Sequence, residues 1–142
     1  MYKRILVALE NGPADRSLVP HVAHLASLLD SELLLIHVAD GWVARHYHDL
    51  KLAESDEMRA DHEYLEQHAT ALGAKGLKVR IHLALGNPPT EILKAAEQEQ
   101  CDLIAMTTHG HRLFGDLFHG STITAVRHKS QIPMLLVRAA AV

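Results

Sequence analysis

A single cysteine, Cys101, is the only thiol among the 142 residues of the sequence. One thiol excludes an intramolecular disulfide and is compatible with a reducing compartment. A chain of this length buries a hydrophobic core large enough to fold without covalent cross-links. Packing alone is therefore expected to hold the fold.

A concentrated basic segment is also lacking. No run of lysine and arginine exceeds the pair Lys3-Arg4, and the formal net charge is -3. Nucleic acids and membrane surfaces attract proteins through dense positive charge. The charge pattern therefore predicts neither a nucleic acid nor a membrane as a partner.

Long hydrophobic runs are absent as well. No apolar stretch approaches the roughly 18 residues that indicate a membrane span. Residues 1–4 lead into a short strand-like run instead of the apolar core of a signal peptide, so we expect a cytoplasmic protein. The chain has no internal repeat, no low-complexity segment and no break in composition, and residues 1–142 are predicted to form a single domain.

The sequence does contain a regular alternation of short apolar runs and segments with helical spacing. Strands are predicted at 5–9, 33–38, 79–83, 103–106 and 133–138, and helices at 14–29, 50–73, 90–99 and 120–130. Residues 41–48 show no periodicity and predict a mobile loop. This order is typical of an α/β fold with a doubly wound, Rossmann-like five-stranded parallel sheet in the order 3-2-1-4-5.

Two of the predicted helices and one strand contain residues that break the simple pattern. Pro20 conflicts with a helix over 14–29, which must either start near it or kink there. His37 and His62 lie on otherwise apolar patterns and are predicted to be interior or half-buried histidines. The inward stripe of the helix at 50–73 is predicted to be Met58, His62, Leu65, Ala69 and Leu72.

The expected ligand site lies at the carboxyl ends of the first and fourth strands, because the winding of the sheet reverses between them. The ends of the first, second and fourth strands then converge on one cleft. Apolar Ala8 and Val38 are placed to flank a base, and Glu10 to accept hydrogen bonds from ribose hydroxyls or an amino group.

A glycine-containing loop joins the fourth strand to the last helix. The first amides of a helix lack intrahelical partners and attract anions, so this loop is predicted to hold phosphates. Gly120 and Ser121 also suit a helix N-cap, a role compatible with phosphate binding, and Arg112 is placed to pair with an anion. The candidate nucleotide-binding residues are Ala8, Leu9, Glu10, Val38, Met106, Thr107, His109, Gly110, Arg112, Gly120, Ser121 and Thr122.

Five segments spread along the whole chain resemble the universal stress protein (UspA-like) family. They are ILVALE at 5–10, LIHV at 35–38, GNP at 86–88, MTTHG followed by nine residues and GS at 106–121, and IPMLLV at 132–137. The resemblance implies an adenine nucleotide alpha hydrolase-like fold and a role in stress response. It also implies ATP as ligand, and a homodimer joined through the last strand, Pro133 to Arg138.

The sequence departs from the family's ATP-binding members at two positions. Those members carry Gly-x2-Gly-x9-Gly-[Ser/Thr], and here Gly110, Gly120 and Ser121 fit this pattern but Thr107 replaces the first glycine. A threonine tolerates positive φ poorly, although its hydroxyl is able to bond a ribose or phosphate oxygen. The aspartate that they place after the first strand is here Glu10, which keeps the charge and reaches one methylene further.

No catalytic constellation is visible. The Gly-x-Ser-x-Gly elbow, the P-loop and the Gly-x-Gly-x2-Gly fingerprint are all absent, so at most slow ATP hydrolysis is expected. The pairs His46/His48 and His109/His111 lack a third ligand, so no protein-held metal is predicted, and Mg²⁺ would accompany the phosphates.

Three functions remain open on the sequence. The first is a regulatory module that binds ATP, ADP or AMP. The second is a dimeric interaction or structural protein of the same fold that binds no nucleotide, which Thr107 and Glu10 favour. The third and weakest is a small-molecule enzyme that uses the same cleft.

Overall fold

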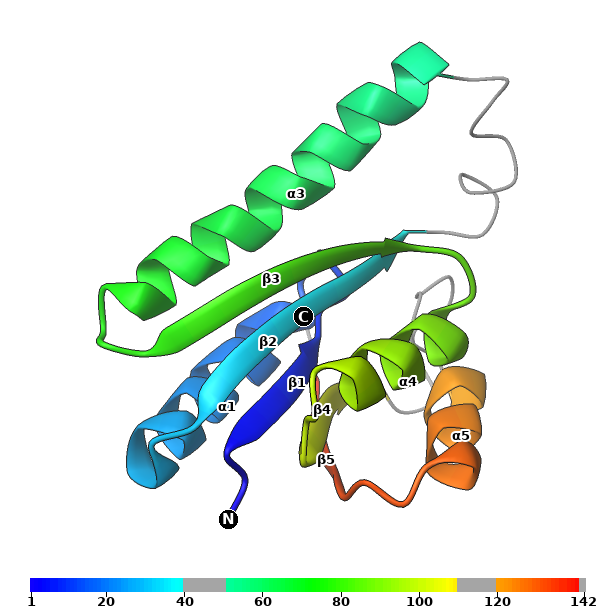
Figure 1. The fold of residues 1–142 in the computed structure, drawn as a ribbon. Coiled ribbons are helices and arrows are strands. Elements are labelled where there is room, and N and C mark those ends of the chain that lie inside the picture. Colours follow the sequence, from blue (N-terminus) through cyan, green and yellow to red (C-terminus); the bar gives the residue numbers. More distant parts are fainter. Residues whose placement is uncertain (40–50, 110–119, 141–142) are drawn as a thin grey trace.

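The structure is a computed structural model that describes residues 1–39, 51–109 and 120–140. Strands and helices alternate along the chain, as the sequence predicts (Figure 1). The elements are β1 (Arg4–Ala8), α1 (Asp15–Leu29), β2 (Glu32–Ala39), α3 (Lys51–Gly73), β3 (Lys78–Leu85), α4 (Pro88–Gln98), β4 (Leu103–Thr108), α5 (Gly120–Lys129) and β5 (Met134–Arg138). The loop predicted at 41–48 lies outside the described residues.

The five strands form one parallel sheet in the order β3-β2-β1-β4-β5, which confirms the predicted order. In the centre of the sheet, Ile5 of β1 lies opposite Leu33 of β2 and Leu103 of β4. The central strands are almost wholly apolar because helices cover both of their faces. The winding therefore reverses between β1 and β4, and their carboxyl ends lie side by side.

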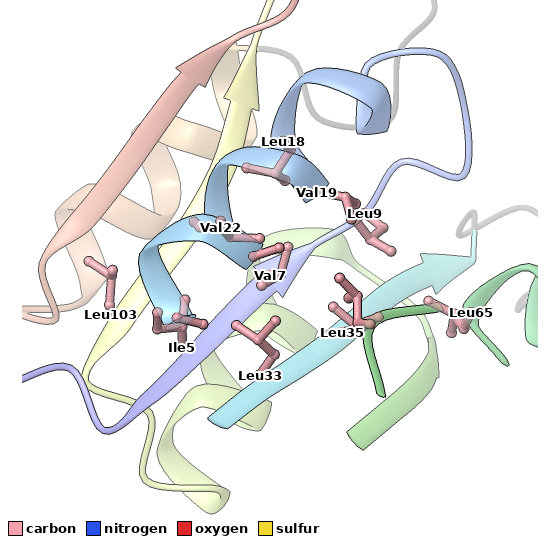
Figure 2. Close-up of a cluster of buried hydrophobic side chains, with 14 residues drawn as sticks. Ile5, Val7, Leu9, Leu18, Val19, Val22, Leu33, Leu35, Leu65 and Leu103 are labelled. Carbon is pink, nitrogen blue, oxygen red and sulfur yellow. The ribbon is translucent and has the colours of Figure 1, made fainter. Parts of the chain in front are cut away.

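Two hydrophobic cores lie on the two faces of the sheet. Alternate residues of β1 point to opposite faces, so Ile5 and Val7 enter the core under α1 and α3, and Leu6 and Ala8 enter the core under α4 and α5. Figure 2 shows the first core, in which side chains of α1 pack onto β1 and β2. These two cores fix the strand ends that carry the candidate site.

Two helices differ from the expectations. The α1 helix begins at Asp15 and continues through Pro20, so the alternative that the regular helix starts near Pro20 is wrong. The prediction that His62 lies on the inward stripe of α3 is also wrong, because His62 is exposed and lies 3.3 Å from the Glu66 carboxylate. Leu65 and Leu72 of the predicted stripe are buried, and the half-buried Asp61 and Tyr64 extend the inward face on the side away from His62.

The polar composition of α3 has a further consequence. It is the longest helix in Figure 1, and its exposed face carries mostly charged and polar side chains. Among the helices of the described ranges, none combines the length and apolar character that crossing a bilayer requires.

At the amino ends of the strands, opposite the candidate site, Asp102 fastens the start of β1 to the start of β4. Its two carboxylate oxygens accept hydrogen bonds from the backbone N–H groups of Lys3 (2.9 Å) and Arg4 (3.1 Å). Partial burial alone would raise the pKa of Asp102, but these two donors outweigh it and hold the pKa below its usual value. The ionised carboxylate therefore stabilises the fold.

We expect Asp102→Ala to lower the free energy of unfolding by about 1 kcal/mol near neutral pH, because a partly exposed carboxylate with two donors is lost. Since the pKa of Asp102 is lowered in the folded state, its contribution is present above the unfolded pKa of about 3.9 and disappears as the pH falls below it. Urea unfolding between pH 7 and pH 3 measures the difference from wild type. Glu97→Ala, at an exposed carboxylate of α4, is the control. An Asp102→Ala deficit that persists undiminished at pH 3 would contradict this account.

Candidate functional site

The Glu10 carboxylate joins the carboxyl ends of β1 and β4. Strand pairing continues through Leu9, whose N–H donates to the Ile36 carbonyl (2.8 Å), and Glu10 follows directly. Oε2 of Glu10 accepts a hydrogen bond from the Thr107 hydroxyl (2.5 Å) and also contacts Nε2 of His109. The side chains of Glu10 and His109 are only 6% and 7% exposed. Three of the sequence-predicted site residues therefore meet in one nearly buried cluster.

Thr107 lies within β4 and not in the loop after it. Its backbone pairs with Val137 of β5, and its side chain is fully buried. The expected problem of positive φ does not arise, because an extended strand is the conformation that β-branched residues favour. What Thr107 contributes at this position is a hydroxyl, directed at Glu10.

Asp15, which the sequence reasoning missed, holds the backbone of the segment that carries Glu10. This buried carboxylate accepts hydrogen bonds from the N–H groups of Glu10 (2.9 Å) and Gly12 (3.3 Å) and from the hydroxyl of Tyr64 on α3 (3.0 Å). An acidic residue just after the turn formers at 11–13 is the only signal in the sequence, since such residues commonly bond backbone amides at a helix start. Asp15 thereby fixes where Glu10 leaves β1.

A second set of contacts ties the same segment to β2 and α3. His37, predicted to be a satisfied interior histidine, is confirmed as one: Nδ1 lies 2.9 Å from the Leu9 carbonyl oxygen. A carbonyl only accepts, so Nδ1 of His37 carries the proton. Nε2 faces the Asp61 carboxylate at 3.7 Å, and Asp61 also accepts a hydrogen bond from the Asn11 amide (3.0 Å).

The apolar candidates divide between the two faces of the sheet. Ala8, Val38 and Met106 are fully buried in the core under α4 and α5, and they form one apolar surface near the strand ends. Leu9 points into the opposite core, under α1 and α3, as Figure 2 shows. Only the backbone of Leu9 takes part in the polar contacts at this edge.

The first turn of α5 supplies the remaining described candidates. Gly120 and Ser121 are exposed and Thr122 is buried. A Cβ added at Gly120 would meet no atom of the described residues within 4 Å. The N–H groups of this turn lack helical acceptors, as at every helix start. Gly110 and Arg112 lie outside the described residues.

These groups can bind polar ligands rather than a metal. Across the described ranges, no three His, Cys, Asp or Glu side chains are grouped closely enough to hold a metal ion. A carboxylate, a hydroxyl and an imidazole at one strand end recognise hydroxyl and amino groups, and the N-terminus of a helix recognises anions. The combination suits a ligand with a sugar and a phosphate.

The Tyr64–Asp15 contact gives a test of how α3 is attached to this edge. Burial, and then the charge and hydrogen bond of Asp15, raise the pKa of Tyr64 above its ordinary value. A phenol whose pKa is raised by folding stabilises the protein fully below the unfolded pKa of about 10, and this contribution is lost as the pH rises through the folded pKa. Tyr64→Phe should therefore cost about 1 kcal/mol at pH 7.

Above about pH 10, the stability of wild type should fall more steeply than that of Tyr64→Phe. Denaturant unfolding from pH 7 to pH 11 measures both effects. Tyr2→Phe removes a hydroxyl at the amino end of β1 and serves as the control. Equal alkaline slopes for wild type and Tyr64→Phe would show that the Tyr64–Asp15 contact does not form in solution.

Comparisons with known proteins place the chain in a family. The model of the Universal stress protein family matches residues 1–138. Universal stress protein MJ0577 of Methanocaldococcus jannaschii is 27% identical, over 97% of this chain and 96% of the relative. The solved structure of MJ0577 superimposes with a TM-score of 0.81 at 29% identity, over 100% of this chain and 99% of that one.

Two more distant structures share the fold. A universal stress protein in complex with cAMP has a TM-score of 0.70 at 16% identity, and each chain is covered to 98%. The universal stress protein from Archaeoglobus fulgidus in complex with dAMP has a TM-score of 0.68 at 21% identity, over 96% of this chain and 98% of that one. With a family match over nearly its whole length, the chain belongs to the universal stress protein family.

Proposed function

We propose that the protein is a regulatory module that binds an adenine nucleotide at the carboxyl ends of β1 and β4, where the winding of the sheet reverses. The observation that carries this proposal is the Glu10 carboxylate, bonded by Thr107 and contacted by His109 at the reversal of the winding. A nearly buried carboxylate needs donors, and a sugar hydroxyl offers the same donor chemistry as the Thr107 side chain. Glu10 is thus an acceptor suited to a ribose.

The phosphates of the nucleotide are assigned to the first turn of α5. Gly120 and Ser121 are exposed there, and among the described residues none would lie within 4 Å of a Cβ at Gly120, which supports the approach of an anion to the backbone. The helix dipole favours negative charge at this end of the helix. Mg²⁺ would be carried by the phosphates, because the described residues provide no cage for it.

The base is assigned to the apolar surface of Ala8, Val38 and Met106. Because these three side chains are fully buried, an adenine ring reaches them only by displacing atoms that pack on them. Two relatives of the same fold are described as complexes with cAMP and dAMP, which supports an adenine nucleotide as the ligand class. The nucleotide would act as a conformational or assembly signal, with slow hydrolysis at most.

Binding should stabilise the native state. ATP, ADP or AMP at about ten times its Kd is expected to add about 1.4 kcal/mol to the free energy of unfolding, because only the folded chain binds it. For a chain of this size the melting temperature should rise by about 4 °C. Thermal melts with each nucleotide, with mass spectrometry of ligand retained after purification, measure this. No shift with any of the three at millimolar concentration would refute nucleotide binding.

A matched pair of α5 variants tests the position of the phosphates. Ser121→Asp puts a negative charge into the first turn, where it favours the helix but repels a phosphate. Thr124→Asp puts the same charge at an exposed position further along α5. The ATP-induced shift should be largely lost in Ser121→Asp and kept in Thr124→Asp, while adenosine should stabilise both. Equal ATP shifts in the two variants would locate the phosphates elsewhere.

A second candidate function is a dimeric interaction protein without a nucleotide. It is favoured by one observation, namely that Oε2 of Glu10 already has two partners within the chain. A site satisfied internally is stable without a ligand. Thermal melts with ATP, ADP and AMP distinguish this function from nucleotide binding, because a protein that binds no nucleotide shows no shift in melting temperature.

We propose further that the protein is a homodimer joined through β5. This strand lies at the edge of the sheet beside β4, and Leu136 on it is 45% exposed. An apolar edge strand exposes backbone groups and side chains that readily pair with a second chain. Pairing of the β5 strands of two chains around a two-fold axis would cover the backbone groups and the apolar side chains of this strand.

Leu136→Lys should convert the dimer to monomers, because it places a charge at the centre of the proposed interface. Leu28→Lys is the matched control, since Leu28 is 70% exposed on α1. Sedimentation velocity at micromolar concentration distinguishes the two species. A wild-type monomer, or a Leu136→Lys dimer, would exclude pairing through β5.

A further inference from the structure

The hydrogen bond from Thr107 to Glu10 is of the same kind as the one that a ribose hydroxyl would donate to this carboxylate. The fully buried Thr107 hydroxyl donates to Oε2 of Glu10 at 2.5 Å, and Nε2 of His109 contacts the same oxygen. A hydroxyl is also what a ribose would present to this carboxylate. The chain therefore already supplies, on β4, the group that a sugar would bring.

This relation changes what a sugar hydroxyl gains from binding. A hydroxyl that meets a buried carboxylate lacking a donor gains a strong charge-assisted hydrogen bond and removes a desolvation penalty. A hydroxyl that approaches Oε2 of Glu10 instead meets an oxygen that Thr107 and His109 already contact, so at this oxygen it competes with the Thr107 hydroxyl. The free energy gained from that hydroxyl is then small.

We infer that the Thr107 hydroxyl is an internal substitute for a sugar hydroxyl, and that it weakens both nucleotide affinity and the selection between ribose and deoxyribose. This inference rests on the proposed nucleotide site and names what sets its specificity. Thr107 acts through Glu10, as a specificity-determining residue in the strand, and needs no contact with the ligand itself. His109 contacts the same oxygen through Nε2, and this contact is common to wild type and both Thr107 variants compared below.

The matched comparison is Thr107→Ala against Thr107→Ser. Both remove the same methyl group from β4, and only the alanine variant removes the hydroxyl. Each protein is titrated calorimetrically with AMP, 2′-deoxy-AMP and 3′-deoxy-AMP, because either sugar hydroxyl is able to meet Glu10. Melting curves of the unliganded variants establish that both are folded.

In wild type, AMP and both deoxy forms should bind within about threefold of one another, because the hydroxyl gains little by exchange. The serine variant keeps the hydroxyl and should retain this weak discrimination. In Thr107→Ala, AMP should bind about tenfold more tightly than in Thr107→Ser, and one deoxy form should lose most of that gain. Glu10→Asp shortens the side chain by one methylene and so withdraws the carboxylate from Thr107. It should change the discrimination between AMP and its deoxy forms in the same direction. This variant provides the second test if Thr107→Ala does not fold.

The outcomes separate this inference from the proposed function. Weaker AMP binding in Thr107→Ala would overturn the inference, because the hydroxyl would then contact the ligand. Equal affinities in the alanine and serine variants, or equal binding of all three nucleotides to both, would overturn it and leave the nucleotide site intact. If no variant and no wild-type protein binds any adenine nucleotide, the proposed function itself fails, and this inference fails with it.

Discussion

The polar contacts at the carboxyl ends of β1 and β4 depend on one constraint: buried carboxylates need hydrogen-bond donors. Unpaired, such a group costs several kcal/mol in a low-dielectric interior. Glu10 obtains a donor from Thr107, and Asp15 obtains the amides of Glu10 and Gly12 together with the Tyr64 hydroxyl. The donors lie on β4, on α3 and on the segment between β1 and α1, so satisfying the two carboxylates links these parts at the place where the winding reverses.

The same constraint explains how α3 can be polar and still be firmly attached. Only a narrow stripe of α3 is apolar, and Leu65 and Leu72 are its buried hydrophobic residues among those described. Asp61 and Tyr64 add specific contacts to His37 and Asp15. Hydrogen bonds of this kind are worth little on average but a great deal when one partner is removed from a buried site. Polar contacts to β2 and to Asp15 therefore add to packing in positioning α3 on the sheet.

The sequence predicted what depends on local pattern. Apolar runs located the strands, and the alternation of strands and helices gave the correct strand order, so Glu10, Thr107 and His109 were expected at one edge. The length of β4 was underestimated because Thr107 and Thr108 are polar yet favour strands. Asp15 and Asp61 were missed because their partners lie on other elements. His62 was misplaced because its spacing matches the apolar stripe, although its side chain lies beside Glu66 on the exposed face of the same helix.

The two departures from the family's ATP-binding pattern act as one coupled change. A glutamate after β1 reaches one methylene further than an aspartate, and this reach brings its carboxylate to β4. A threonine at 107 then supplies the donor that the longer side chain needs. With glycine at 107, Glu10 would lose that donor; with aspartate at 10, the Thr107 hydroxyl would lose its acceptor while remaining fully buried. The glutamate and the threonine therefore act as hydrogen-bond partners for each other and link the carboxyl ends of β1 and β4.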